Sequence, residues 1–318
     1  MSADINILEM KDWILPFPLP IVIALISIGV SILLFIVKAN REGVDKSRGL
    51  ASEEQEKVPE GSLLSKDERV LHPALFKKFK LVKSVKASHN TKLLTFEIPD
   101  NKCLGLPIGR HISLMVHLDG NKVIRPYTPV SRPDQKGHFE ILIKTYNLGK
   151  MSPFLFSMPV GDSIDVRGPV GRFKYAPNMY KHIGLVCAGT GLTPPLQVIR
   201  CILEGEQAAS DQTRMTLIYQ NRMPQDVLMR DTLTQLEETH PDRLRVFYCL
   251  SNPSDEWGVG GRAGKEIRGY VTTQLLRDKM PLSDCDLVGL CGPSGFNDQM
   301  LNHLESIGFE KNKNIYVW

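Results

Sequence analysis

The residues with the clearest chemical potential form a glycine-rich turn between an apolar strand and a helix. The predicted strand is Ile183–Ala188, the turn is Gly189-Thr190-Gly191, and Thr193 and Pro194 open the helix. Glycines let a phosphate approach the backbone, and the unpaired N–H groups at a helix start favour an anion. The spacing departs from G-x-G-x-x-G because Pro194 takes the last glycine position. The turn is a candidate nucleotide-phosphate site, and a plain strand-to-helix turn is the alternative.

A second candidate motif stands at the end of a predicted strand and reads Arg125-Pro126-Tyr127-Thr128-Pro129-Val130-Ser131. The arginine offers a planar fork for a phosphate, the tyrosine an aromatic face for a ring, and the hydroxyl groups short hydrogen-bonding side chains. The prolines hold the chain extended. The motif therefore suits a ligand with both a phosphate and a ring, and a rigid surface strand with an exposed arginine is the alternative.

Two further junctions carry residues of the same kind. Gly149-Lys150-Met151-Ser152 places a glycine before a short helix that we expect Ser152 to cap, which would form an anion-binding nest. Cys291-Gly292-Pro293 follows a late strand, at the carboxyl end where open α/β sheets bind ligands. The alternatives are an ordinary helix start and a simple connecting turn.

The elements that position these motifs fall into two blocks. Residues 71–179 contain alternating β-type runs separated by turns, which predict an antiparallel β-barrel domain. These runs are Lys80–Lys86, Lys92–Ile98, His111–Leu118, Phe139–Tyr146 and Ser163–Val166. In residues 180–318 strands alternate with helices, which predicts an α/β domain with a doubly wound parallel sheet. Its strands are Ile183–Ala188, Met215–Gln220, Leu244–Leu250, Leu287–Leu290 and Ile315–Val317, and its helices are Pro194–Leu203, Gln225–Thr239, Thr272–Lys279 and Phe296–Ile307.

The amino-terminal region predicts a membrane anchor. After a leader (1–13), residues 14–37 lack charge and are mostly apolar, and as a helix they would extend about 36 Å. A signal peptide and a buried core helix are the alternatives. Residues 38–70 are polar and predict a flexible tether. Four basic residues beyond the span, against an acidic leader, place the body in the cytosol. They are Lys38, Arg41, Lys46 and Arg48.

Composition excludes several classes of protein. The chain has 318 residues, long enough for two domains and a tail. Its six cysteines contain no C-x-x-C pair, so we expect no metal or iron–sulfur site. The net charge of +4 comes without a basic stripe interleaved with aromatic residues, which argues against nucleic acid and is compatible with an acidic protein partner.

Taken together, the four motifs resemble those of the NADH–cytochrome b5 reductases, flavoproteins of the ferredoxin-reductase-like superfamily. The resemblance covers about Leu71 to Trp318 with the motifs in the same order, and His89-Asn90-Thr91 is similar to fungal members. It implies FAD and NADH as cofactors and hydride transfer to the flavin. It also implies single-electron transfer to cytochrome b5, at the cytosolic face of the endoplasmic reticulum or mitochondrial outer membrane.

The resemblance also implies roles for matching residues in the flavin domain. Arg125, followed by Pro126, holds the flavin pyrophosphate, Tyr127 lies against the isoalloxazine, and Thr128 sits near its reactive nitrogen. Lys144 matches a lysine on the long barrel strand, with Leu142 and Tyr146 on the same face because strand side chains alternate. The pyrophosphate-binding helix start corresponds to Gly149, Lys150, Met151 and Ser152.

In the nucleotide domain, the resemblance makes Gly189, Thr190 and Gly191 the nicotinamide-domain loop, with Thr193 reaching toward the flavin. Cys291, Gly292 and Pro293 match a Cys-Gly-Pro loop beside the nicotinamide. The residues expected at the reacting rings are Thr128, Lys144, Thr193 and Cys291.

Three positions depart from the family pattern. Leu148 stands where many relatives have glycine, and Ser294-Gly295-Phe296 replaces a proline-rich continuation. Ser251 takes the place of an Asp or Asn that helps to select the unphosphorylated ribose, and Arg222 is a candidate neighbour. An NADPH-preferring reductase of another acceptor, for example in diphthamide synthesis, is therefore an alternative. A flavin-free anchored adaptor is a second one.

Two other features have simpler interpretations. The lysine run Lys77, Lys78, Lys80, Lys83 and Lys86 is typical of a solvated strand edge, with docking of an acidic electron acceptor as the functional alternative. Trp257 and the glycine-rich segment Gly258–Gly264 predict a surface loop.

Overall fold

The computed structural model describes residues 70–318 except 133, 146–148 and 259–263. The predicted leader, anchor and tether lie outside these residues, apart from Val70. Within the described part of the chain, no helix has the length and hydropathy that a membrane span requires.

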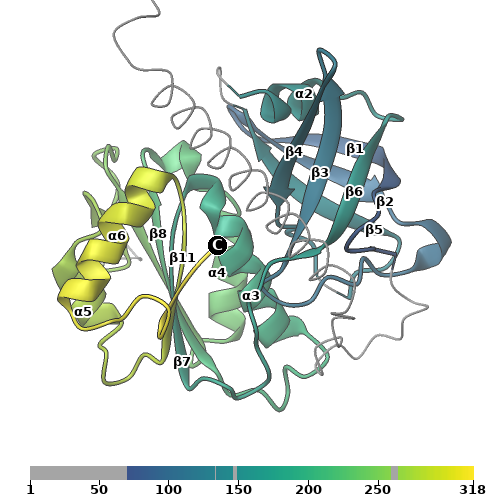
Figure 1. The fold of residues 1–318 in the computed structure, drawn as a ribbon. Coiled ribbons are helices and arrows are strands. Elements are labelled where there is room, and N and C mark those ends of the chain that lie inside the picture. Colours follow the sequence, from purple (N-terminus) through teal and green to yellow (C-terminus); the bar gives the residue numbers. More distant parts are fainter. Residues whose placement is uncertain (1–69, 133, 146–148, 259–263) are drawn as a thin grey trace, which may run out of the picture. The chain divides into compact units, whose positions relative to one another are not determined.

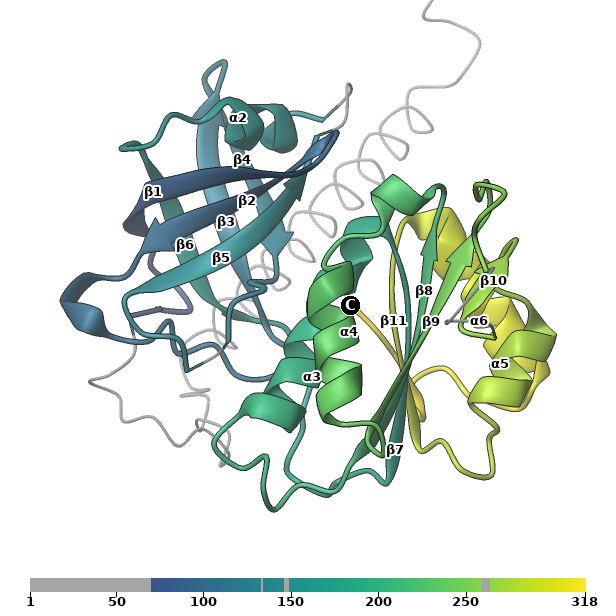
Figure 2. The ribbon, with the colours of Figure 1, turned by 180° about the vertical axis from the view of Figure 1, so that it is seen from behind.

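The first half of the described chain forms a six-stranded antiparallel sheet (Figures 1 and 2). Its strands are β1 (Lys77–Ser88), β2 (Thr91–Glu97), β3 (His111–Leu118), β4 (Asn121–Tyr127), β5 (His138–Lys144) and β6 (Ser163–Val170). A 3-10 turn, η3 (Pro99–Asn101), and a short helix, α2 (Met151–Ser157), complete it. All six strands and α2 contribute side chains to one core, in which the Phe139 ring stacks on Phe96 at 5.3 Å. The strands therefore enclose their apolar residues from several sides.

The strand order is β4-β3-β6-β1-β2-β5. The predicted antiparallel sheet is confirmed, whereas hydrogen-bonded pairing among the described residues does not join β4 to β5 into a closed barrel. The register also bears on the interpretation of the lysine run. β1 pairs with β6 over Lys77–Lys80 and with β2 from Leu81 to Ser88, so each stretch has one paired neighbour in the described register. All five lysines are exposed, as expected for a solvated strand.

The second half forms a six-stranded parallel sheet with the order β10-β9-β8-β7-β11-β12. Its strands are β7 (His182–Ala188), β8 (Arg214–Asn221), β9 (Leu244–Leu250), β10 (Glu266–Arg268), β11 (Leu287–Cys291) and β12 (Ile315–Val317). Helices α3 (Thr193–Glu204) and α4 (Arg230–Thr239) cover one face, and α5 (Thr273–Lys279) and α6 (Ser294–Ser306) cover the other (Figure 1). The doubly wound arrangement is as predicted, and its strand order reverses between β7 and β11.

One predicted helix is wrong in its extent. The segment expected as a continuous helix over Gln225–Thr239 divides into a 3-10 turn, η5 (Pro224–Asp226), and α4, which begins only at Arg230. Met229 between them has φ of 54°, a left-handed conformation that cannot continue an α-helix. This break lets η5 turn away from α4 at the carboxyl end of β8.

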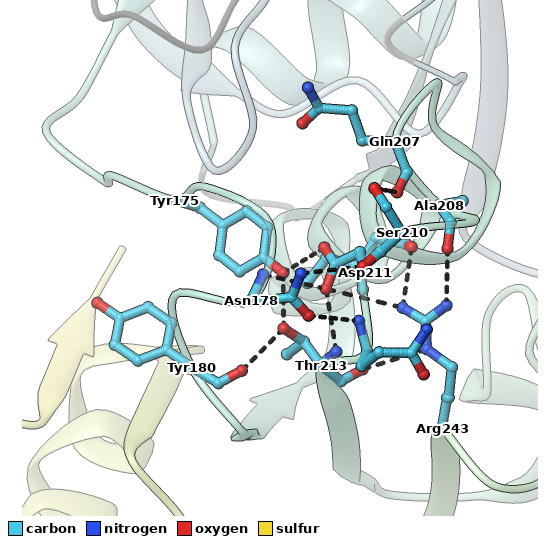
Figure 3. Close-up of polar contacts among 11 residues, drawn as sticks. Tyr175, Asn178, Tyr180, Gln207, Ala208, Ser210, Asp211, Thr213 and Arg243 are labelled. Atoms are coloured by element: carbon cyan, nitrogen blue, oxygen red, sulfur yellow. Dashed lines mark hydrogen bonds and ion pairs between the residues drawn. The ribbon is translucent and has the colours of Figure 1, made fainter.

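The segment that connects the two sheets is tied to the amino end of the parallel sheet (Figure 3). The Tyr175 hydroxyl donates to the Asp211 carboxylate at 2.5 Å, and its oxygen lies 2.8 Å from the Thr213 hydroxyl. The Asn178 side chain donates to the Ser210 carbonyl at 2.9 Å. Burial of the Tyr175 phenol and its bond to Asp211 raise its pKa, so it stays a donor at neutral pH. This network holds the connection at the sheet end opposite the predicted ligand site.

Candidate functional site

The carboxyl ends of β7 and β11 bring together two of the motifs. An added Cβ on Gly191 would lie 2.3 Å from the Cys291 carbonyl oxygen, so the two loops touch through their backbones. Gly292 likewise has no room for a side chain, because Phe296 Cδ1 would be 2.5 Å from it. Gly189 adopts φ of 55°, where glycine carries no steric penalty. The sequence spacing predicted a ligand site at this switch point, and the close packing explains why glycines occur there.

The glycine turn is held rigidly from within the domain. Residues Gly189–Leu192 form a 3-10 turn, η4, that leads directly into α3. The Thr193 hydroxyl donates to the Thr190 carbonyl at 3.2 Å. From below, the buried Tyr219 hydroxyl donates to the Gly189 carbonyl at 3.0 Å. Tyr219 was not predicted as a site residue, because a tyrosine in an apolar strand is typical of core packing.

Strand β5 of the antiparallel domain packs against the glycine turn of the parallel domain. Its residues alternate, with Ile141 and Ile143 in the core of the antiparallel domain and Leu142 in the core of the parallel domain. The Lys144 ammonium lies 3.2 Å from an oxygen of Asp226, which belongs to η5. The predicted common face of Leu142 and Lys144 is confirmed, and β5 packs against η4; Tyr146 lies outside the described residues.

The arginine–tyrosine motif lies at the end of β4. Arg125 is exposed, and its guanidinium donates only to the carbonyl of its neighbour Ile124 among the described contacts, at 2.8 Å. Pro126 is exposed as well, whereas Thr128 is buried. Burial raises the pKa of the half-buried Tyr127 to about 12, although the Arg125 charge opposes the shift. The site thus presents a neutral phenol beside a guanidinium that can still bind an anion.

Helix α2 packs against both β5 and β4, the strand that carries the arginine–tyrosine motif. The residue that caps α2 is Lys150, and no side-chain hydrogen bond closes this end. The prediction that Ser152 caps the helix was therefore wrong, because Ser152 already lies in the first turn. Met151 is anchored in the antiparallel core, Gly149 is half-buried just before the helix, and Leu148 is outside the described residues.

Cys291 ends β11 with an uncharged thiol. It pairs in register with Cys187 of β7, and burial raises the pKa of the Cys291 thiol to about 12. A thiol with this pKa is not a nucleophile at neutral pH. Cys291 therefore serves as a small apolar contact beside the loops, with Gly292 half-buried and Pro293 exposed behind it.

Ser251 and Arg222 lie side by side at the carboxyl ends of β9 and β8. The Ser251 amide donates to the Asn221 carbonyl at 3.1 Å, and the next amide, of Asn252, donates to the Arg222 carbonyl at 2.8 Å. Arg222 is exposed and Ser251 half-buried. Because the two strand ends are adjacent, one ligand group could contact both side chains.

The expectation for Trp257 was wrong. Its ring is buried, 6.4 Å from Tyr248 in an edge-on contact, and the Arg230 guanidinium lies 5.0 Å from its centre. Arg230 is in turn paired with Glu266. The Trp257 ring packs the segment after β9 against the domain core. Sequence periodicity did not indicate this burial, because Trp257 lies outside any regular element.

The residues present fit FAD and a nicotinamide nucleotide. An exposed guanidinium and a neutral aromatic ring lie together on the antiparallel sheet, and glycine turns without side chains line the parallel sheet. Family models agree with this division. Residues 78–175 match the oxidoreductase FAD-binding domain, and residues 185–301 match the oxidoreductase NAD-binding domain. The fold and site therefore define an oxidoreductase that binds FAD and NAD.

Comparison with known proteins gives the family. The chain is 41% identical to NADH-cytochrome b5 reductase 1 of Dictyostelium discoideum over 79% of this chain and 84% of that protein. It is 39% identical to NADH-cytochrome b5 reductase 1 of Meyerozyma guilliermondii, over 78% and 85% of the two chains. The cytochrome b5 reductase domain of Ulva prolifera nitrate reductase superimposes with a TM-score of 0.70 at 30% identity, covering 79% of this chain and 100% of that domain. The chain belongs to the NADH–cytochrome b5 reductase family.

Proposed function

We propose that this chain is an NADH-dependent FAD flavoprotein, anchored in a membrane by residues 14–37, that delivers electrons singly to cytochrome b5. The observation that carries the proposal is the convergence of three segments. Strand β5 packs against the turn Gly189–Leu192, Leu142 and Leu192 share one hydrophobic core, and the turn contacts Cys291 through its backbone. Two rings held from the two domains would meet at this boundary.

The residues of the antiparallel domain would bind and orient FAD. Arg125 would neutralise the pyrophosphate with its free guanidinium, supported by the backbone at Gly149–Ser152. Tyr127 would contact the isoalloxazine as a neutral ring, and Thr128 would lie near its reactive edge. FAD, when bound, supplies the conversion of a two-electron hydride into single electrons.

The residues of the parallel domain would orient NADH and exclude water. Gly189–Gly191 would receive the nucleotide because no side chain blocks the turn, while Thr193 and Cys291 would border the nicotinamide. Hydride transfer depends on alignment of the two rings and needs no general acid or base. The high pKa of the Cys291 thiol agrees with a role in shape, since the thiol stays uncharged beside the nicotinamide.

The nucleotide preference depends on Ser251 and Arg222. An acidic residue in place of Ser251 would repel a ribose phosphate, and serine does not. Steady-state kinetics with NADH and NADPH decide the question. A turnover with NADPH equal to or above that with NADH would overturn the NADH assignment while leaving the flavoprotein assignment in place.

The electron acceptor and the membrane location complete the proposed function. The exposed lysines of β1 favour an acidic protein such as cytochrome b5, because complementary charge speeds encounter. An anchored body on the cytosolic face of the endoplasmic reticulum or the mitochondrial outer membrane would share a surface with a membrane-bound acceptor, and the tether would raise its effective concentration. Fractionation of tagged protein, with protease digestion of intact organelles, tests this placement.

The principal experiment uses the full chain in detergent. Flavin absorbance near about 450 nm is followed as NADH is added without oxygen, and oxidised cytochrome b5 is then supplied. We expect the flavin to bleach and cytochrome b5 to become reduced. A colourless protein would favour the adaptor. Bleaching without reduction of cytochrome b5 would favour another small acceptor, such as a component of diphthamide synthesis.

A further inference from the structure

Asp226 is a buried carboxylate that meets two basic side chains of the other domain. Its side chain is 8% exposed and belongs to η5, just after β8 of the parallel sheet. The Lys144 ammonium of β5 lies 3.2 Å from Oδ1, and Nε2 of His89 lies 3.9 Å from the same oxygen. None of the sequence motifs includes Asp226, which is 82 residues from Lys144 along the chain.

The carboxylate is fixed within its own domain. The second carboxylate oxygen, Oδ2, accepts a hydrogen bond from the backbone N–H of Met223 at 3.2 Å. The backbone N–H of Asp226 donates to the Met223 carbonyl at 3.0 Å. These two bonds close the η5 turn around the side chain. Oδ1 is therefore presented in one direction, toward the antiparallel domain.

The backbone positions of the two basic residues, Lys144 and His89, are also fixed. Lys144 pairs in register with Thr91 of β2, and the Thr145 amide donates to the Asn90 carbonyl at 2.9 Å. His89 and Lys144 are thus held at the same end of two neighbouring strands. Lysine has a long flexible stem, so a partner of fixed position is what restricts its ammonium to one location.

We propose that Asp226 is a positioning residue for Lys144. Its carboxylate holds the ammonium at η5, on the side of β5 that meets the parallel domain, and so aligns the two domains for hydride transfer. The pair is largely shielded from solvent, with Lys144 16% exposed, so the attraction is weakly screened. This inference rests on the proposed role of Lys144 at the reacting rings.

The test measures flavin reduction by NADH in a stopped-flow instrument, with the full chain in detergent. Asp226→Asn removes the charge but keeps an oxygen for the Met223 amide. We expect the limiting rate of flavin reduction to fall between about tenfold and a hundredfold, the effect of displacing a reacting group by up to about 1 Å. Flavin content should change little. Asp226→Glu, which retains the charge, should recover part of the rate.

The decisive measurement is a double-mutant cycle with Lys144→Met. If Asp226 acts through Lys144, adding Asp226→Asn to Lys144→Met causes no further loss of rate. The matched control is Arg132→Met, which removes a different contact between the domains, from Arg132 to the Glu204 carbonyl at 2.7 Å. We expect this control to leave the rate within about twofold of the unmodified chain, because an exposed polar contact contributes little.

Several results would overturn the inference. These are an unchanged rate in Asp226→Asn, additive losses in the double mutant, or an Asp226→Glu variant no faster than Asp226→Asn. A fully active Lys144→Met variant would overturn it together with the role of Lys144. Failure of the unmodified chain to be reduced by NADH is a separate result, and it would instead refute the proposed function.

Discussion

Replacement of Gly191 by alanine tests whether the contact between the β7 and β11 loops builds the site. The added Cβ would lie 2.3 Å from the Cys291 carbonyl oxygen, 2.7 Å from its carbonyl carbon and 3.0 Å from Gly292 Cα. Ordinary contact begins near 3.4 Å, so the loops must separate by about 1 Å. All three clashing atoms belong to the backbone, and no side chain can rotate to relieve the strain.

Overpacking of this kind costs about 1–3 kcal/mol. For a body of this size, each kcal/mol lowers the unfolding temperature by about 2–4 °C, so we expect a decrease of about 2–12 °C. A displacement of 1 Å at a reacting centre also lowers kcat/KM for NADH by about a hundredfold. Thermal unfolding and steady-state kinetics measure the two effects.

Gly295→Ala is the control, because its added Cβ would meet no atom within 4 Å and its φ is not positive. It should leave the unfolding temperature unchanged or slightly higher, since alanine favours a helix. Equal behaviour of Gly191→Ala and Gly295→Ala would refute the argument that backbone contact between the two loops forms the site.

Three further predictions concern other parts of the molecule. Trp318→Ala removes the N–H that donates to the Gly109 carbonyl at 2.9 Å and the ring whose centre lies 5.3 Å from that of Phe173. We expect the free energy of unfolding, measured in urea, to fall by about 2–3 kcal/mol. An unchanged free energy of unfolding would contradict the packing role of Trp318. The folded-state pKa values of Tyr127 and Cys291, both raised to about 12, favour their protonated forms, so stability should be constant below about pH 9 and fall as the pH rises toward 12. Thermal unfolding across this pH range should show a shallower decline for Cys291→Ala, and an unchanged slope would count against burial of the thiol. Ser251→Asp should lower kcat/KM for NADPH at least about tenfold relative to NADH through repulsion of a ribose phosphate, and an unaltered ratio would mean that this position does not contact the ribose.

The two-domain plan and most of the elements could be predicted from the amino-acid sequence. Strand β3 and strands β9 and β12 have the predicted bounds, and most other elements differ by a few residues at their ends. This succeeds because alternation of apolar residues and glycine or proline punctuation are local properties. The same locality placed the glycine turns at the carboxyl ends of the strands. The parallel domain also showed why a helix prediction can fail, since the left-handed Met229 carries no signal in residue type.

The contacts between residues far apart in the sequence could not be predicted and are known only from the folded chain. Lys144 was singled out from its strand, whereas its partner Asp226 was not, because a pair separated by 82 residues leaves no spacing to detect. Tyr219 and Trp257 were missed for other reasons. A tyrosine in an apolar strand is typical of core packing, and Trp257 lies outside any regular element. The change of β1 from pairing with β6 to pairing with β2 was equally hidden, because it depends on long-range pairing and not on the strand's own composition. Local sequence patterns determine the secondary structure of each segment. Long-range packing, within and between the domains, determines which carboxylate, ring or carbonyl each side chain contacts.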